Sequence, residues 1–163
     1  LQHLLTHKIE FLWRIHRVHH SDTEMDVSTA IRFHPIEIAL SMALKIGLVY
    51  ALGADPLSVL IFEILLNGSS IFNHANINIP NRIDKIVRFV IVTPDMHRIH
   101  HSSDRIEHDT NFGFALSIWD HLFRTYKSQP ERDHKEMEIG LNWQDEKPER
   151  LGWSLGLPFK KNG

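Results

Sequence analysis

The sequence predicts an all-α fold, in which a membrane helical hairpin carries a helical, histidine-rich cap on the cytoplasmic side. Two apolar runs, residues 36–52 and 57–72, are each close to membrane-spanning length and are joined by the short link G-A-D-P. The motif H-x-x-H-H occurs on both sides of these runs, as H-R-V-H-H at 16–20 and H-R-I-H-H at 97–101. The histidine spacing in each motif suits one face of a helix.

Composition narrows the classes of function. The chain has 163 residues, with 18 basic and 20 acidic side chains. This balance argues against a nucleic-acid binder, because no strongly basic face is implied. Cysteine is absent, so a bound metal must be held by nitrogen and oxygen. Thirteen histidines are more than packing requires, and their clustering points to metal binding.

The first segment, residues 1–20, mixes apolar and basic residues without Gly or Pro, which predicts one or two helices joined around residues 8–11. A polar stretch follows at 21–35. It offers helix N-cap residues and ends at Pro35, which suits the first turn of the next helix.

The hairpin comes next, although Glu37, Lys45 and Glu63 interrupt its apolar runs. A buried hairpin in a soluble bundle remains the alternative for this segment taken alone. A membrane hairpin returns the chain to the side of the membrane that it left, so both H-x-x-H-H motifs would share one compartment. Basic residues flank the hairpin on that side, which predicts a cytoplasmic location by the positive-inside bias. They are Arg14, Arg17, Arg32, Arg82, Lys85 and Arg88.

Residues 83–92 place apolar side chains at helical spacing, as either an interfacial helix or an ordinary amphipathic core helix would. We expect a single domain over 1–163. It comprises two histidine boxes at 1–35, the membrane hairpin at 36–72, a third box with the cap at 73–126, and a soluble tail at 127–163. The chain starts at Leu1 with its helical pattern already running, and we interpret it as a fragment that lacks upstream membrane helices.

Nine histidines are the candidate metal ligands. In H-x-x-H-H the three imidazoles lie at i, i+3 and i+4, within reach of one ion or of two neighbouring ions. The pair at i, i+4 near the start of the chain has the same property, and one more histidine follows the second apolar run. Nine ligands are too many for one ion and suit two. The set is His3, His7, His16, His19, His20, His74, His97, His100 and His101.

Polar residues close to these histidines are candidates for supporting roles. Asp95 and Asn111 are predicted as catalytic-site residues that accept the second ring N–H of a ligand or hold a water. Asp22 and Asp109 are further candidates for such contacts. Imidazole suits zinc, iron, copper and nickel alike, so ligand type does not choose the metal.

At these residues the chain resembles the fatty acid hydroxylase and sterol desaturase superfamily of integral-membrane di-iron oxygenases. Its three boxes correspond to H-L-L-T-H, H-R-V-H-H and H-R-I-H-H, in that order and with the hairpin between the second and third. The surrounding segments L-W-R-I-H-R-V-H-H-S, T-P-D-M-H-R-I-H-H-S, D-T-N-F-G and W-D-H-L-F-R-T-Y match as well. The resemblance runs from His3 to about Tyr126.

The resemblance implies two iron ions bound by the nine histidines, with His74 as the intervening ligand. Some members carry a further histidine four residues later, where this chain has Asn78. Similar proteins use O2 to hydroxylate or desaturate a lipid, with electrons from NAD(P)H through a carrier such as cytochrome b5 or a ferredoxin. The expected location is a bacterial inner membrane or the endoplasmic reticulum. The alternative function is a non-catalytic, histidine-rich protein that binds or transports metal.

Overall fold

The computed structural model describes residues 1–134, 136–143 and 148–161. Within these ranges every regular element is a helix, which confirms the all-α fold class, and two isolated β-bridges join loop residues. The helices are α1 (Gln2–Lys8), α2 (Glu10–His20), η1 (Thr29–Ile31), α3 (Pro35–Leu52), α4 (Pro56–His74), α5 (Asn81–Val87), α6 (Pro94–His100), α7 (Arg105–His108), α8 (Ile118–Phe123), α9 (Leu151–Gly156) and η2 (Leu157–Phe159).

The two long helices, α3 and α4, form the expected hairpin, and local signals fix their ends. Each begins with a proline at its first position, where the missing N–H costs no hydrogen bond. The Asp55 side chain caps α4 by accepting hydrogen bonds from the backbone N–H groups of Leu57 and Ser58, at 3.0 and 3.1 Å. Helix α3 ends at Gly53, whose φ of 62° is the left-handed conformation that glycine adopts without steric cost.

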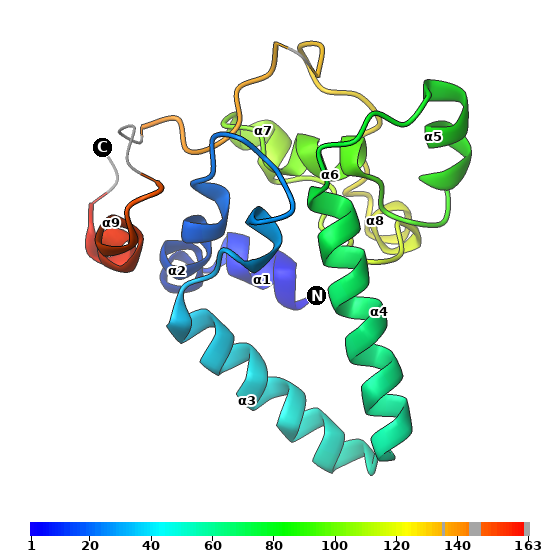
Figure 1. The fold of residues 1–163 in the computed structure, drawn as a ribbon, viewed down its shortest axis with the longest axis vertical. Coiled ribbons are helices and arrows are strands. Elements are labelled where there is room, and N and C mark those ends of the chain that lie inside the picture. The colour runs from blue at the N-terminus through cyan, green and yellow to red at the C-terminus, as the bar shows by residue number, and fades with distance from the viewer. Residues whose placement is uncertain (135, 144–147, 162–163) are drawn as a thin grey trace.

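The arms of the hairpin diverge from this turn, and the rest of the described chain lies at their open end (Figure 1). We call these remaining residues the cap. A single ion pair joins the arms part of the way up, where Lys45 Nζ lies 2.7 Å from Glu63 Oε1.

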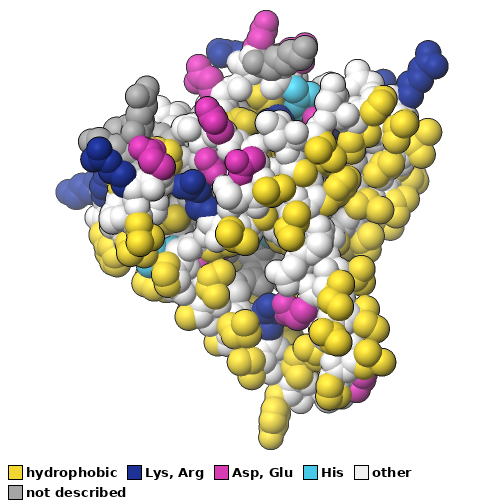
Figure 2. Space-filling model, viewed as in Figure 1, with side chains coloured by type: hydrophobic (Ala, Val, Ile, Leu, Met, Phe, Trp, Pro, Cys, Tyr) yellow, Lys and Arg dark blue, Asp and Glu magenta, His cyan; other side chains and the backbone are white. Residues whose placement is uncertain are grey.

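Apolar side chains cover the outside of the hairpin (Figure 2). No residue of α3 is buried, and both helices are long and apolar enough to cross a membrane. Large apolar side chains exposed over two whole helices are costly in water and favourable in hydrocarbon. This pattern opposes the alternative of a buried hairpin in a soluble bundle.

In the cap, α1 and α2 pack against each other, and α6 packs beside the end of α4. A small hydrophobic cluster lies between α2 and the C-terminal segment, where Val18 contacts Trp153 and Leu157. Arg17 donates hydrogen bonds to the carbonyls of Leu157 and Lys160, both at 2.6 Å. The C-terminal segment is therefore docked on α2. The division of the chain at residues 35, 72 and 126 remains a prediction.

Helix α5 and the turn that follows it expose apolar side chains. Ile83 and Ile86 on the helix and Phe89 and Val90 after it are all exposed, which fits an interfacial segment better than a core helix. The basic residues that flank the hairpin are not all free charges, because Arg88 is buried against Asp84 in an ion pair. The side of the membrane on which the cap lies remains a prediction.

Candidate metal centre

The nine histidines come together as two groups at the open end of the hairpin, eight of them from the cap and His74 from the end of α4. The ligand atoms within each group all lie within 4.8 Å of one another. The five-histidine group comprises His3, His7, His16, His20 and His100. The four-histidine group comprises His19, His74, His97 and His101. The three histidines of each H-x-x-H-H motif are therefore divided between the two groups.

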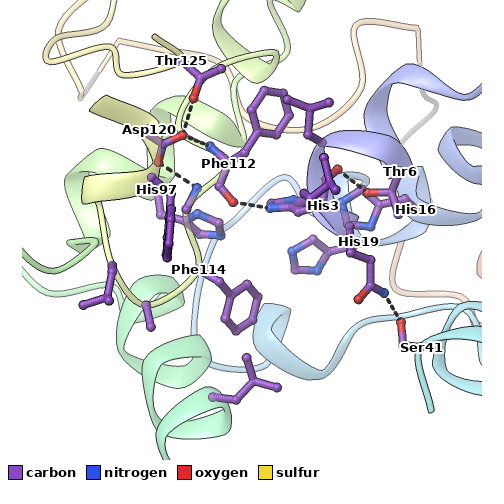
Figure 3. Close-up of a pocket in the computed structure, with 18 of the residues that line it drawn as sticks. His3, Thr6, His16, His19, Ser41, His97, Phe112, Phe114, Asp120 and Thr125 are labelled. Atoms are coloured by element: carbon purple, nitrogen blue, oxygen red, sulfur yellow. Dashed lines mark hydrogen bonds between the residues drawn. The ribbon is translucent and has the colours of Figure 1, made fainter. Parts of the chain in front are cut away.

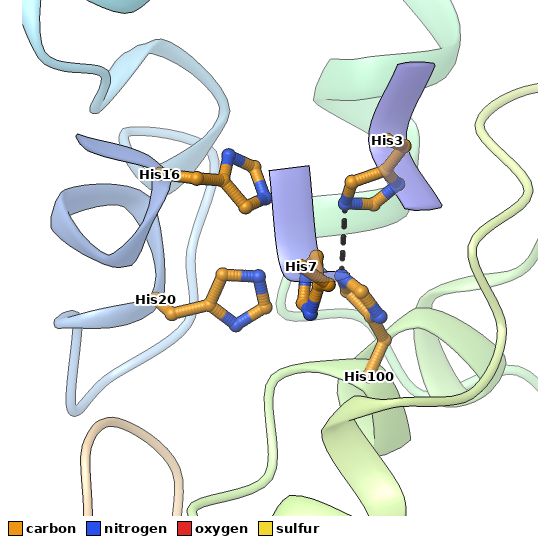
Figure 4. A group of neighbouring side chains, drawn as sticks. All are labelled: His3, His7, His16, His20 and His100. Carbon is orange, nitrogen blue, oxygen red and sulfur yellow. Dashed lines mark hydrogen bonds between the residues drawn. The ribbon is translucent and has the colours of Figure 1, made fainter. Parts of the chain in front are cut away.

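The helical register explains this division. On α2, residues 16 and 20 are one turn apart and point to the first group (Figure 4). Residue 19 belongs to the second group. On α6 the assignment is reversed, because His97 and His101 enter the four-histidine group and His100 enters the five-histidine group. Helix α1 supplies only the first group, and the end of α4 supplies only the second.

The two groups are direct neighbours. The ring of His20 stacks on that of His101 with centroids 4.5 Å apart, and these rings belong to different groups. His97 and His100 stack in the same way at 5.2 Å. The arrangement therefore suits two adjacent ions rather than two independent sites.

Backbone carbonyls fix the tautomer of several rings. His3 donates its Nδ1 hydrogen to Phe112 O at 2.9 Å, and His100 donates its Nδ1 hydrogen to Thr110 O at 2.8 Å. Since a neutral imidazole carries one proton, both Nε2 atoms are then bare acceptors. Those two Nε2 atoms face each other at 3.0 Å. Two lone pairs at this distance repel each other unless a cation lies between or beside them.

The four-histidine group repeats this arrangement. His19 and His74 donate their Nδ1 hydrogens to Arg32 O at 3.2 Å and Ser70 O at 2.7 Å. Their Nε2 atoms lie 3.1 Å apart, and His74 Nε2 also lies 3.1 and 3.2 Å from the Nε2 atoms of His97 and His101. The converging Nε2 atoms of the four imidazoles are a donor set that fits a metal cation.

A proton is a poor substitute for that cation. Eight of the nine rings are buried, and His3 is half-buried. Burial, reinforced by neighbouring histidines, lowers the pKa of His3 to about 3. The same causes hold the pKa values of His19 and His101 well below their ordinary value of 6.5. At neutral pH these rings are therefore uncharged, which is the state that binds metal.

Acidic side chains support the five-histidine group from outside. His16 donates its Nδ1 hydrogen to Glu37 Oε1 at 2.6 Å, so the imidazole and carboxylate form the pair that orients metal-bound histidines. Asp109 Oδ1 lies 3.6 Å from His7 Nδ1, as its position in the sequence suggested. Glu37 was missed in this role because it reads as a charge interrupting an apolar run. Its position two residues into α3, next to α2, is visible only in the fold.

The structure places Asp95 and Asn111 outside both histidine groups. Asp95 is in the first turn of α6 and interacts electrostatically with His134. The Asn111 amide donates hydrogen bonds to Met96 O at 3.0 Å and Lys127 O at 2.9 Å. Its Oδ1 accepts from Lys127 N at 2.9 Å. These contacts hold backbone segments together, and the catalytic role of the two residues remains a prediction.

The other polar candidates have separate partners. Asp22 pairs with Arg32 at 3.2 Å and accepts a hydrogen bond from Thr29 Oγ1 at 2.7 Å. His34 caps α3, with its Nδ1 accepting from Ile36 N at 3.2 Å. His108 lies with His7 and Asp109 at the edge of the five-histidine group, where its ring stacks on Trp13.

A cavity of about 670 Å³ reaches the histidines from the side of the hairpin. His3, His16, His19 and His97 line one end of it (Figure 3). Its volume lies within the range of small-molecule pockets. The wall also includes the apolar residues Leu4, Phe33, Leu66, Phe112, Phe114, Leu116, Trp119 and Phe123, with Lys45 on α3 as a charged member. The cavity thus joins the candidate metal centre to the apolar space between the arms.

A membrane-length hairpin with nine histidines gathered in two adjoining groups where it meets the cap defines a membrane protein with a candidate dinuclear metal centre. The profile of the fatty acid hydroxylase family matches residues 1–125. This chain belongs to that family and is an integral membrane protein.

The curated proteins that this chain is similar to are named for different lipids. An ornithine lipid hydroxylase of Rhizobium tropici is 34% identical over 132 residues, covering 80% of this chain and 38% of the relative. Alkylglycerol monooxygenase of Homo sapiens is 28% identical over 135 residues, covering 80% of this chain and 28% of the relative. Cholesterol 25-hydroxylase of Rattus norvegicus is 28% identical over 131 residues, covering 78% and 42%. The chain thus spans less than half of each of these relatives, and no solved structure matches it.

Proposed function

We propose that the protein is a membrane-bound di-iron oxygenase that hydroxylates a lipid C–H bond. The observation that carries this proposal is the convergence of nine imidazoles in two adjoining groups at one end of an apolar cavity. When bound, a pair of iron ions would supply the reductive activation of O2 that attack on an unactivated C–H bond requires.

The protein's own residues hold and orient this centre. The five- and four-histidine groups would each hold one ion through their imidazole nitrogens. Glu37 fixes the ring of His16, and the carbonyls of Thr110 and Phe112 fix those of His100 and His3. The smaller group supplies one protein ligand fewer. Asn78, where some relatives have a histidine, is exposed, and the Asn76 side chain accepts a hydrogen bond from Arg98 at 3.2 Å instead.

The substrate is a lipid whose apolar portion enters from the bilayer. The cavity wall is largely apolar and opens between helices that themselves face the membrane. Phe33, stacked on His19 with ring centroids 4.3 Å apart, and Phe112 would pack against the alkyl portion beside the histidines. The alkyl portion would then pass from the bilayer into the cavity without contact with water.

Hydroxylation is favoured over desaturation by the relatives, because the similar proteins described above are named hydroxylases or monooxygenases. Electrons would come from NAD(P)H through a cytochrome b5-like protein or a ferredoxin, which meets the cap on the cytoplasmic side of a bacterial inner membrane or the endoplasmic reticulum.

Metal transport, the alternative function, gains no support from the hairpin. A conducted ion needs a series of free polar groups along its path. Of the three charged side chains there, Glu37 is bonded to His16, and Lys45 and Glu63 are paired with each other.

The test combines metal analysis with lipid profiling of cells that express the full protein. We expect about two irons per chain, spin-coupled in the Mössbauer spectrum, and a lipid class that gains one oxygen atom only in the presence of O2. His19→Ala and His100→Ala should abolish the product while the protein still inserts into the membrane. An exposed control, His121→Ala, should retain it. Product formation unchanged by His19→Ala or His100→Ala would refute the proposal, and metal flux across vesicles would favour transport.

A further inference from the structure

Asp120, on α8, is a buried aspartate whose carboxylate is fully engaged with a neighbouring loop. Its side chain is 1% exposed and accepts hydrogen bonds from the backbone N–H groups of Phe112 and Gly113, both at 2.7 Å. Thr125 donates its hydroxyl hydrogen to the same carboxylate at 2.6 Å. The two backbone donors tie the loop 110–113 to α8, and Thr125 holds the carboxylate from the other side of that helix.

The same loop positions the five-histidine group. While the Phe112 N–H is held by Asp120, the Phe112 carbonyl accepts the Nδ1 hydrogen of His3 (Figure 3). Two residues earlier, Thr110 O accepts the Nδ1 hydrogen of His100. Both rings belong to the five-histidine group, and their Nε2 atoms converge at 3.0 Å. The carbonyl supports of His19 and His74, in the other group, come from Arg32 and Ser70 instead.

The loop has little room to adjust if this support is lost. A Cβ atom at Gly113 would lie 2.6 Å from Asp120 Oδ2 and 2.9 Å from Leu116 O, so only glycine allows this close approach. Asn111 has a φ of 52°, and its amide bonds to Met96 and Lys127 hold it in that left-handed conformation. The path from α8 through the loop to the imidazoles is therefore rigid.

We propose that Asp120 is a positioning residue that fixes the imidazoles of His3 and His100 through the loop 110–113, and so sets the metal affinity of the five-histidine group alone. This inference rests on the proposed function for the presence of two ions, but not for the reaction that they support. Loss of outer supports around metal-bound histidines weakens metal binding by about 10- to 100-fold in other sites.

The decisive variant is Asp120→Asn in the full protein. In the wild type, three donors share the two oxygens of the Asp120 carboxylate. An asparagine replaces one of these oxygens by an NH2 group, so at least one backbone N–H faces another donor. Asp84→Asn is the matched control, because Asp84 is also a buried aspartate of the cap and pairs with Arg88 outside both histidine groups. Gly113→Ala displaces the same loop from the other side of the contact.

Titration of metal-free protein with Fe2+ alone, under anaerobic conditions, reads out the two affinities without turnover. We expect Asp120→Asn and Gly113→Ala to weaken one of the two ions by about 10- to 100-fold and to leave the other unchanged. After oxidation, the Mössbauer signal of a spin-coupled pair should give way to that of an isolated iron. Asp84→Asn should keep both ions even where its melting temperature falls as far.

Two wild-type affinities in Asp120→Asn, or equal weakening of both ions, would overturn the positioning role. Wild-type protein that binds two ions and converts no lipid would remove the oxygenase proposal and leave this inference standing. Wild-type protein that binds no pair of ions would overturn both.

Discussion

The Nε2 atoms of His19 and His74 lie 3.1 Å apart, although these residues are 55 positions apart in the chain and each ring has already donated its Nδ1 hydrogen to a backbone carbonyl. No proton is left on either neutral ring to make this contact a hydrogen bond. The two Nε2 lone pairs are therefore available to bind one cation.

Removing one imidazole of this pair should empty one metal site. We expect His74→Ala to lower the iron content from about two ions per chain to about one, because the four-histidine group then retains three ligands. Elemental analysis of protein purified without chelators measures this content. His121→Ala, at an exposed position of α8 outside both histidine groups, serves as the control and should retain both ions. Two irons in His74→Ala would remove His74 from the ligand set.

The hydrogen bond between His16 and Glu37 should tune the metal affinity of the five-histidine group. Glu37→Gln keeps an acceptor oxygen for His16 Nδ1 but removes the negative charge, so the imidazole becomes a weaker donor to metal. We expect about tenfold weaker Fe2+ binding at one of the two sites, measured by anaerobic titration. The matched control is Glu10→Gln at the exposed start of α2. Equal affinities for Glu37→Gln and wild type would show that the contact is not functional.

Acid should destabilise the metal-free protein, and the direction follows from the histidine pKa values. Burial lowers the pKa of His3 to about 3, against an ordinary value of 6.5. Between these values the unfolded chain binds a proton that the folded chain excludes, so stability is fully present above 6.5 and falls as pH decreases toward 3. Each such histidine contributes a slope of about 1.4 kcal/mol per pH unit in this window.

Thermal unfolding of metal-free protein at about pH 7.5 and about pH 5.5 tests this direction. The melting temperature should be lower at the acidic pH, and His3→Gln should reduce the difference because one excluded proton is removed. A melting temperature that rises on acidification would contradict the assignment of neutral buried rings.

The Lys45–Glu63 pair should stabilise the hairpin as a unit. Lys45→Met leaves a carboxylate without its partner between two membrane helices. We expect a loss of about 3 kcal/mol in unfolding free energy, as for breaking a buried pair, because a carboxylate between membrane helices has little water to solvate it. The double variant Lys45→Met and Glu63→Met should recover most of it. Unfolding in mild detergent measures both, and a double variant less stable than either single one would exclude this role.

The sequence by itself determined the local features of this protein. Proline and capping residues mark where α3 and α4 begin, and a glycine marks where α3 ends. Spacings of i, i+3 and i+4 bring histidines to one helical face whatever the rest of the chain does. Eight of the nine candidate ligands were predictable for this reason, His74 was predicted from its place after the second apolar run, and the family profile over residues 1–125 agrees with the predicted resemblance.

Only the tertiary structure decided how these pieces meet. The division into groups of five and four depends on how α1, α2, α4 and α6 are rotated against one another, and side-chain spacing within one helix carries no information about that rotation. Glu37 supports His16, and Asp120 acts on His3 through a loop carbonyl, across separations that only the packed cap creates. Asp95 lies two residues before His97 but outside both groups, because residues two apart on a helix point to nearly opposite sides.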